Sequence, residues 1–425
     1  MKIIRHLRLL VVFLSTVFSG GVFADSPNNE ALLKLSNDLL KNNTFETLKY
    51  DKGQKWVSVG MGGYLKQYYS RDTFITFKGA RYSDELRPIF SHAIDWFGRN
   101  QLADGYIPIW YRETTPKLGV VDLNMYLMAP FDRTEKDGGI RQVDHVEQFI
   151  EAIYDDYDIT QDKLVLAKRY VKAEKAWRYL AGLTNDSLIT TVRSPYAGPD
   201  WADRVSRSGK AAFVNAYWYQ VTVLMARMSD ILGNKKQRDF YNAKAKIIRS
   251  KFNSTFWRQG QPINCKHKIG GFYAAWVDKG SRSGDYFELD SNSLAVAAGL
   301  ADLDRSRLIL NEISGKFDYY VNSVGATRVL CGTYQNLDTL VKKETYHNGG
   351  YWYLVSYYLA AALKKHPDDY GRFLTELHMR ASRAAEVADS TGLNEWYDEN
   401  GIPKGGETYS WSIAFPIYLN ALIAE

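Results

Sequence analysis

Two neighbouring stretches decide the fold that this sequence predicts. They are KAAFVNAYWYQVTVLMARMSDIL, residues 210–232, and KKQRDFYNAKAKIIRSKF, residues 235–252. The first is apolar almost all round, whereas the second is apolar on one face only, through Phe240, Tyr241, Ile247, Ile248 and Phe252. A helix that is apolar on every side is buried, and a one-faced helix covers it from outside. A buried helix followed by a half-exposed one therefore predicts concentric layers of helices.

The same alternation recurs further along the chain. A more apolar stretch precedes a less apolar one at 289–300 with 305–317 and at 349–364 with 368–387, and the last stretch, 410–424, is again nearly all apolar. Strand-like runs are few, at 55–61, 188–193 and 270–277. We expect an all-α fold of about ten to twelve helices, in a single domain over residues 25–425 with the shape of an α/α toroid. A plain helical bundle or an α-solenoid is the alternative.

The N-terminal residues have the composition of a signal peptide. Basic residues up to Arg8 precede a mostly apolar stretch, residues 9–23, and Val22-Phe23-Ala24 fits a cleavage site. The apolar stretch is short for a membrane span, which needs about 20 residues, and an uncleaved anchor is the alternative. We therefore expect residues 1–24 to be removed, leaving a secreted or periplasmic protein without membrane attachment.

The charge and the cysteines exclude some partners. Residues 1–24 carry Lys2, Arg5, Arg8 and no acidic residue, so their removal lowers the formal charge from +6 to +3. So small a charge, without a basic cluster, gives no basis for binding nucleic acid. Cys265 and Cys331, the only cysteines, can form a disulfide in an exported protein or remain as two thiols. They form no CxxC or Cys/His spacing, so we expect no thiolate metal site.

Two acidic clusters among aromatic residues indicate the chemistry. One is Pro199-Asp200-Trp201-Ala202-Asp203-Arg204, and the other runs from Asn394-Glu395-Trp396-Tyr397 to Gly401, followed by Tyr409-Ser410-Trp411-Ser412. Carboxyl groups move protons and flat aromatic faces stack on sugar rings, so both clusters point to sugar chemistry. Each lies beside a helical stretch, and loops on a rigid scaffold usually carry function. We expect both at the rim of one helical cup.

A series of short motifs runs through the chain in order. They are Ser70-Arg71-Asp72-Thr73, Asp144 with Phe149-Ile150-Glu151-Ala152-Ile153, the cluster at Asp200 with Asn215-Ala216-Tyr217-Trp218-Tyr219, Tyr346-His347-Asn348-Gly349-Gly350 with Trp352, and the C-terminal cluster. This order resembles that of the α/α-toroid glycosidases, which include amylo-α-1,6-glucosidase domains, processing α-glucosidase I and mannosylglycerate hydrolase. The resemblance implies an (α/α)6 toroid of six helical hairpins and an inverting glycoside hydrolase. The chain has Asp290-Ser291-Asn292-Ser293 in place of a debranching-type Asn-Gln signature, which argues against an α-1,6-glucan substrate.

The resemblance also implies roles for individual residues. The general acid is an Asp four residues before an Arg, which falls on Asp200, and the general base heads a Glu-x-Tyr-Asx segment, which falls on Glu395. Asp203 is the alternate acid, and Glu407, in a Gly-rich stretch similar to that of the trehalases, is the alternate base. The expected substrate-binding residues are Arg71, Asp72, Asp144, Trp201, His347, Asn348, Trp352, Trp396 and Trp411. Hydrolysis by two carboxyl groups needs no cofactor or metal.

Structural explanations compete with each of these roles. Asp200 can cap a helix or pair with Arg204, Arg71 with Asp72 can form a buried ion pair, and any one Trp can belong to the core. The sequence as a whole predicts an exported, inverting hydrolase of an α-linked oligosaccharide or small glycoside. The alternatives are an α/α-toroid unsaturated-uronyl hydrolase or polysaccharide lyase, and a non-catalytic sugar-binding protein.

Overall fold

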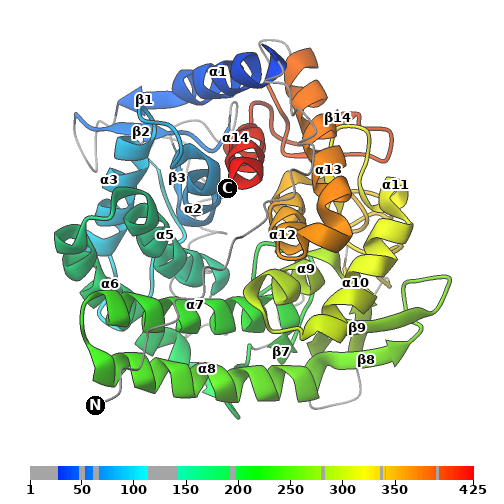
Figure 1. Ribbon diagram of the computed structural model, residues 1–425, viewed down its shortest axis with the longest axis horizontal. Helices are drawn as coiled ribbons and strands as arrows, with labels where there is room; N and C mark the ends of the chain where they lie inside the picture. The colour runs from blue at the N-terminus through cyan, green and yellow to red at the C-terminus, as the bar shows by residue number, and fades with distance from the viewer. Residues whose placement is uncertain are drawn as a thin grey trace, which may run out of the picture.

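Figure 1 shows helices arranged in two layers around a central axis. The computed structural model describes residues 27–46, 53–60, 67–112, 142–191, 198–278, 283–335, 338–339, 341–388 and 392–425, and the predicted signal peptide lies outside these residues. The helices are α1 (Pro27–Asn42), α2 (Ser70–Ala80), α3 (Arg87–Arg99), α5 (Asp144–Thr160), α6 (Lys163–Gly182), α7 (Ala212–Ile231), α8 (Lys235–Phe256), α9 (Leu289–Ala298), α10 (Leu303–Gly315), α11 (Phe317–Tyr320), α12 (Tyr353–Lys364), α13 (Pro367–Val387) and α14 (Ser410–Ala424).

Six of these helices form a closed inner ring. In the order α2, α5, α7, α9, α12 and α14, each packs against the next, and α14 packs against α2 to close the ring (Figure 1). The outer helices α1, α3, α6, α8, α10 and α13 alternate with them along the chain, and each packs against an inner helix. The predicted (α/α)6 toroid is therefore confirmed, in place of an open solenoid or a plain bundle.

The burial of α7 and α8 follows their sequence patterns. α7 is buried along most of its length, as expected for a helix that is apolar on every side. α8 buries Tyr241, Ile248 and Phe252 on one face. Phe240 and Ile247, which the pattern placed on that face, are 43% and 45% exposed. The buried face of α8 is therefore narrower than the sequence indicated.

Side-chain caps at helix N-termini occur in some of the outer helices, although not in α3 and α13. The outer helices α6, α8 and α10 start at Asp162, Asn234 and Asp302, whose side chains accept hydrogen bonds from backbone N–H groups of the first turn. In the described part of the chain, no inner helix has a side-chain cap at its N-terminus. Uncapped N–H groups carry partial positive charge. The inner helices thus present positive ends to the loops that precede them.

The strands are short and lie in the connections between helices. They are β1 (Thr44–Glu46), β2 (Lys55–Val57), β3 (Gln67–Tyr69), β4 (Trp110–Arg112), β5 (Thr184–Asn185), β6 (Leu188–Ile189), β7 (Lys210–Ala211), β8 (Trp257–Gly260), β9 (Ile269–Val277), β10 (Ser283–Phe287), β11 (Thr327–Arg328), β12 (Tyr351–Trp352), β13 (Trp396–Tyr397) and β14 (Pro403–Lys404). Only the run at 270–277 forms a long strand, β9. The antiparallel order β11-β12-β13-β14 pairs Tyr351 with Tyr397 and so joins two of the predicted site motifs.

Cys265 and Cys331 form a disulfide, one of the two options that the sequence left open. Their Cα atoms are 5.4 Å apart, and 66 positions separate them in the chain. The bond encloses β9, β10, α9, α10, α11 and β11. None of the helices in the described ranges is long and apolar enough for a membrane span.

Candidate active site

Most of the predicted site residues gather at one end of the ring. We call this end the cup, and define it by residues 71–72, 142–144, 198–209, 346–352, 394–396 and 405–411. The inner helices start here: Arg71 and Asp72 lie in the first turn of α2, Asp144 opens α5, and Trp411 follows the first residue of α14. The cup therefore receives the positive ends of these helices, which favour carboxylates.

An ion pair between α2 and α5 forms part of the cup. Arg71 donates from Nε to Asp144 Oδ2 at 2.7 Å and from Nη2 to Asp144 Oδ1 at 2.8 Å, and Nη2 also donates to Gln142 Oε1. Burial alone would raise the pKa of Asp144, but the charge and hydrogen bonds of Arg71 outweigh burial and lower it to about 2. Asp144 is thus a permanent carboxylate that holds Arg71 in place. Its fully buried side chain acts through Arg71.

Asp200 is held beneath the surface of the cup. Its side chain is fully buried, and both of its carboxylate oxygens accept hydrogen bonds from Arg207 Nη1 at 2.6 Å. Oδ1 also accepts the backbone N–H of Ala202. These contacts use the whole carboxylate and leave none of it open to a substrate. Its partner is Arg207, whereas the sequence had suggested Arg204.

The same arginine is the centre of a buried network. Arg207 Nη2 lies 2.9 Å from Glu288 Oε2 and 3.4 Å from Asp290 Oδ2, and the side chains of all three are fully buried. Burial raises the pKa of Glu288 to about 8, although Arg207 opposes the shift, so this carboxyl is protonated at neutral pH. Asp290 accepts the indole N–H of Trp201 at 2.7 Å. The network therefore fixes the loop that carries Trp201 and Asp203.

Asp203, three residues after Asp200, is the carboxyl group that reaches the cup. Its side chain is 39% exposed. Oδ1 is buried without a hydrogen-bond partner and lies 3.6 Å from Nδ1 of His347, which is also without one. Burial raises the pKa of Asp203, and the charges of Arg71 and Arg204 oppose this. Burial, followed by the charges of Arg207 and Arg71, lowers the pKa of His347 well below its usual range, so this ring is neutral.

Aromatic rings connect the motifs into one wall. His347 stacks on Trp352 with ring centroids 5.0 Å apart, and Trp201 meets both rings edge to face. Trp411 lies 6.3 Å from Trp352. Trp396 contacts this wall through Tyr346, with the two ring centroids 6.1 Å apart. The structure thus brings all four predicted tryptophans and His347 together from three separate loops.

Glu395 faces the same wall. Its Oε1 accepts a hydrogen bond from Tyr346 Oη at 3.3 Å, and Oε2 accepts the backbone N–H of Gly406 at 3.0 Å. Burial raises its pKa to about 7, and the charges of Asp72 and Asp203 add to the shift. Gly405 has φ +72°, and a Cβ there would lie 2.5 Å from Glu395 Oε2. Glycine at this position therefore lets the backbone approach the carboxyl closely.

Asp72 is the third titratable carboxyl of the cup. It is buried, and Oδ1 accepts a hydrogen bond from Tyr409 Oη at 2.8 Å. Burial raises its pKa to about 6, and the charge of Arg71 opposes the shift. The ring of Tyr409 lies 4.6 Å from that of Trp411, so Asp72 adjoins the aromatic wall. The negative charge of Asp72 is the largest charge effect that raises the pKa of Glu395.

Two sequence-predicted residues have other surroundings. Asn348 is buried, with Oδ1 accepting the N–H of Tyr334 and Nδ2 donating to Val341 O, so its amide braces a loop and does not reach a ligand. Glu407, the alternate base, is exposed, whereas Glu395 is buried against Tyr346 and Gly406. Glu395 therefore lies among the other site residues and Glu407 faces the solvent, while the amide of Asn348 is bound to the backbone.

Reasoning from the sequence overlooked residues whose role is to hold others. Tyr346, Tyr409 and Arg207 received no role, although each contacts a site carboxyl. One signal was available: the spacing of an Asp four residues before an Arg occurs twice, at Asp200–Arg204 and at Asp203–Arg207. A second is structural, since Tyr346 has φ +47°, a left-handed conformation that is costly for a non-glycine residue.

Known proteins share both the sequence pattern and the fold. The profile of the amylo-α-1,6-glucosidase family matches residues 39–417. No curated protein matches the chain significantly. A GH63 mannosylglycerate hydrolase from Thermus thermophilus, solved with Tris and D-glycerate, is 13% identical with a TM-score of 0.63, over 92% of this chain and all of that chain (100%).

A second solved structure is similar to the same degree. It comes from Streptococcus pneumoniae and represents a family of metal-independent α-mannosidases, in a non-productive complex with α-1,6-mannobiose. It is 14% identical with a TM-score of 0.61, over 94% of this chain and 95% of that chain. At such identities, both structures support the toroid fold.

Proposed function

The chain belongs to the amylo-α-1,6-glucosidase family and is a glycoside hydrolase, and on that premise we propose that it hydrolyses small α-linked glycosides or oligosaccharides with inversion. In this proposal Asp203 is the general acid and Glu395 is the general base. One observation carries the assignment: Asp203 approaches His347, His347 packs on Tyr346 with ring centroids 4.1 Å apart, and Tyr346 binds Glu395. Two carboxyl groups with raised pKa values thus flank one aromatic surface.

The choice of Asp203 over Asp200 rests on access. A general acid must reach the glycosidic oxygen and carry a proton. Asp200 has no exposed side-chain surface, and Arg207 binds both of its oxygens. Burial raises the pKa of Asp200 although the charge of Arg207 opposes the shift, so access to the substrate is what separates Asp200 from Asp203. Asp203 is 39% exposed, and burial raises its pKa. Asp200 then serves to anchor the loop that presents Asp203.

Glu395 has the features of a base that activates water. Gly406 N–H and Tyr346 Oη fix its two oxygens from the protein side. In an inverting reaction such a base takes a proton from a water molecule, which attacks the anomeric carbon from the face opposite the leaving group. Asp203 meanwhile gives its proton to the departing oxygen. The products are a free sugar of opposite anomeric configuration and the alcohol of the aglycone.

The remaining residues would bind the sugar. Trp352, Trp411 and Trp396 offer aromatic faces, and Asp72 and Arg71 can hydrogen-bond hydroxyl groups. The proposal of an α-linked substrate is supported by the relatives of this fold, which are a mannosylglycerate hydrolase and an α-mannosidase. The composition of residues 1–24 supports export to the periplasm or the medium.

Leaving-group dependence separates the two catalytic roles. The purified protein would first be screened on α-glucosides and α-mannosides, and the accepted sugar then supplied as a disaccharide and as its α-glycosyl fluoride. Asp203→Asn should lose about 10²- to 10⁴-fold in kcat/KM on the disaccharide, because protonation of the leaving oxygen is lost. It should retain most activity on the fluoride, which departs with little protonation. Glu395→Gln should lose activity on both substrates.

The control and the stereochemistry complete the test. Asp200→Asn, measured on protein shown to be folded, should lower kcat/KM on the disaccharide and on the fluoride by the same factor. If Asp200→Asn instead shows the dependence on leaving group and Asp203→Asn does not, Asp200 is the acid. Proton NMR of the first product from the α-glycoside should show the β-anomer. An initial α-anomer would exclude the single-displacement mechanism.

A further inference from the structure

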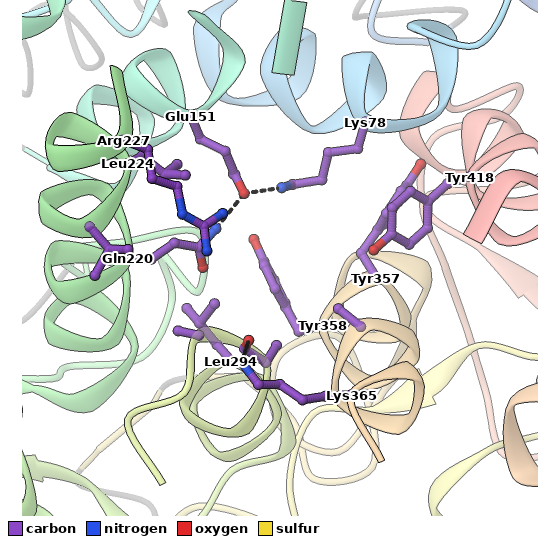
Figure 2. Close-up of a pocket in the computed structure, with 14 residues that line it drawn as sticks. Lys78, Glu151, Gln220, Leu224, Arg227, Leu294, Tyr357, Tyr358, Lys365 and Tyr418 are labelled. Atoms are coloured by element: carbon purple, nitrogen blue, oxygen red, sulfur yellow. Dashed lines mark hydrogen bonds and ion pairs between the residues drawn. The ribbon is translucent and has the colours of Figure 1, made fainter. Parts of the chain in front are cut away.

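A second cavity opens on the barrel axis at the end of the ring opposite the cup. We call it the base pocket. It has a volume of about 220 Å³ and is lined by all six inner helices, including Lys78 of α2, Glu151 of α5, Gln220 and Arg227 of α7, Lys365 at the end of α12 and Tyr418 of α14 (Figure 2). The inner helices begin at the cup, and Lys78 and Glu151 lie seven residues beyond Arg71 and Asp144. Seven residues of helix span about 10 Å, so this pocket is separate from the cup.

The acid that lines the base pocket is already neutralised. Glu151 Oε1 lies 2.6 Å from Lys78 Nζ and also accepts a hydrogen bond from Gln220, and Oε2 accepts one from Tyr217 Oη at 2.6 Å. Figure 2 shows Lys78 and Glu151 meeting across the cavity wall. These contacts leave neither Glu151 nor Lys78 with unmet charge.

Two further cations at the base pocket lack such a partner. Within the described ranges, neither Arg227 nor Lys365 forms an ion pair with a carboxylate. Lys365 Nζ donates to the carbonyl of Ala297 at 3.1 Å, which satisfies one of its three donors. Arg227 influences the pKa of Asp158 from a distance without pairing with it. Burial lowers the pKa of Lys365, and the charges of Arg227 and Arg249 lower it further. Arg227 and Lys365 are both exposed, so their positive charges face the solvent at this end of the ring without a directly paired carboxylate among the described residues.

A neutral donor completes the group. Burial raises the pKa of Tyr418, so its hydroxyl keeps its proton, and no other described residue binds that hydroxyl. Tyr418 is one of the residues that line the cavity in Figure 2. Apolar side chains of α7, α9 and α12 fill the remaining wall. A cavity of this size holds a small organic molecule, since one water in the liquid takes about 30 Å³.

We propose that the base pocket binds a small organic anion, with a phosphate or carboxylate group placed between Arg227 and Lys365 and hydrogen-bonded by Tyr418. Two unbalanced cations and a free hydroxyl donor are complementary to an oxyanion. The carbonyl groups at helix C-termini satisfy these cations only in part. The carbonyl of Ala297 binds one donor of Lys365, and within the described residues no carbonyl binds Arg227. The proposal does not depend on the catalytic roles of Asp203 and Glu395.

Calorimetric titration of the full chain with inorganic phosphate tests the site. The wild type should bind phosphate, and the double variant Arg227→Ala with Lys365→Ala should bind it at least about tenfold more weakly. The matched control is Lys236→Ala with Lys364→Ala, which also removes two cations, one of them adjacent to Lys365 but not lining the pocket. It should bind as the wild type does. Absence of binding in the wild type, or equal binding in the Arg227/Lys365 variant, would overturn the proposal.

Further arms locate the site and identify the anionic group. Arg204→Ala removes an exposed cation at the cup, so loss of binding in this variant alone would place the phosphate in the cup and also overturn the proposal. Titrations with glycerol 3-phosphate, lactate and neutral glycerol then compare the binding of a phosphate, of a carboxylate and of an uncharged molecule. We expect the two anions to bind with the same dependence on Arg227 and Lys365, and glycerol to show none. The tighter of the two anions identifies the class of ligand.

Discussion

The same two helices are joined by an ion pair at each end of the ring, and the two pairs differ in what surrounds them. At the cup, Arg71 of α2 pairs with Asp144 of α5, and two turns further along both helices Lys78 pairs with Glu151. Asp144 is fully buried, and beside Arg71 lie the titratable carboxyls Asp72 and Asp203. Glu151 keeps slight exposure and has two further donors, Tyr217 and Gln220. Gln142 supports the arginine of the first pair, whereas in the second pair two further donors bind the carboxylate itself.

The difference follows the direction of the inner helices. Carboxylates gather where the helices begin, as with Asp72, Asp144 and Asp290, and cations gather toward their ends, as with Lys78 and Lys365. Helix dipoles favour this sorting. One architecture thus gathers carboxyl groups at one end of the ring and places Lys78, Arg227 and Lys365 toward the other.

Breaking each ion pair in turn should give the largest contrast. Arg71→Ala leaves the buried charge of Asp144 unpaired and should lower the free energy of unfolding by about 3–5 kcal/mol. It should also reduce kcat/KM on the preferred substrate by at least about tenfold. Lys78→Ala should cost about 1–3 kcal/mol, because Tyr217 and Gln220 still bind Glu151. It should leave kcat/KM within about threefold, because the altered pair lies two turns from the cup.

Urea denaturation and steady-state kinetics measure both quantities. Arg71→Lys keeps the charge but loses the bidentate geometry, and should fall between wild type and Arg71→Ala in stability. Equal losses of stability and turnover in Arg71→Ala and Lys78→Ala would show that the two pairs are equivalent.

A smaller effect should appear in the stability of Glu395→Gln. The pKa of Glu395 is raised to about 7 in the folded state, so ionisation favours the unfolded chain. The wild type therefore loses stability as the pH rises from about 4.5 to about 7, and the amide variant does not. At pH 8 Glu395→Gln should be more stable than wild type by about 1–3 kcal/mol, and at about pH 4 the two should be nearly equal. Thermal unfolding at both pH values measures this.

The opposite end supplies the control for that experiment. Glu151→Gln removes a carboxylate that is paired with Lys78, so it should destabilise the protein at pH 8. If Glu395→Gln gains as much stability over wild type at pH 4 as at pH 8, the charge of Glu395 is not the cause of the gain.

The smallest effect concerns the pH dependence of turnover. The charge of Asp72 raises the pKa of Glu395, so Asp72→Asn should lower that pKa. The acidic limb of kcat/KM against pH should therefore move to lower pH, by about half a unit to one unit. Tyr409 can still donate to the amide oxygen, which preserves the geometry. If the acidic limb of kcat/KM keeps its pH in Asp72→Asn, or moves by the same amount in Glu151→Gln, then the ionisation of Glu395 does not cause that limb.

The fold was predictable from sequence because burial leaves a periodic record. The contrast between an all-apolar α7 and a one-faced α8 is sufficient to indicate two layers. The closure of six inner helices into a ring depends on contacts between distant parts of the chain, which periodicity does not reveal. The prediction of a six-hairpin toroid rested on the order of the motifs. Of the strand-like runs at 55–61 and 188–193, the strands cover Lys55–Val57 and Leu188–Ile189, and residues 61, 192 and 193 lie outside the described residues. An apolar run does not reveal how few of its residues find a pairing partner.

The sequence predicted which motifs lie close together, but it did not predict the contacts of the individual carboxyl groups. Every aromatic residue chosen from the sequence reached the cup, since motifs before inner helices converge there. Asp200 and Asp203 both stand four residues before an arginine, and sequence spacing does not state which arginine is buried. The burial of Asp200 and the contact of Arg207 with both of its oxygens distinguish it from Asp203, whose side chain is partly exposed. The sequence motif of Asn348 likewise does not show that backbone groups of Tyr334 and Val341 bind its amide.

The disulfide between Cys265 and Cys331 gives the fold a dependence on redox conditions. It ties together a segment of 66 positions that contains α9 and α10, one of the inner helices and its outer neighbour. For a loop of that length, restriction of the unfolded chain contributes about 4 kcal/mol to stability. A chain that folds where thiols remain reduced lacks this contribution, and the ring then closes around a longer unconstrained segment. The stability of the toroid therefore depends on whether this disulfide has formed.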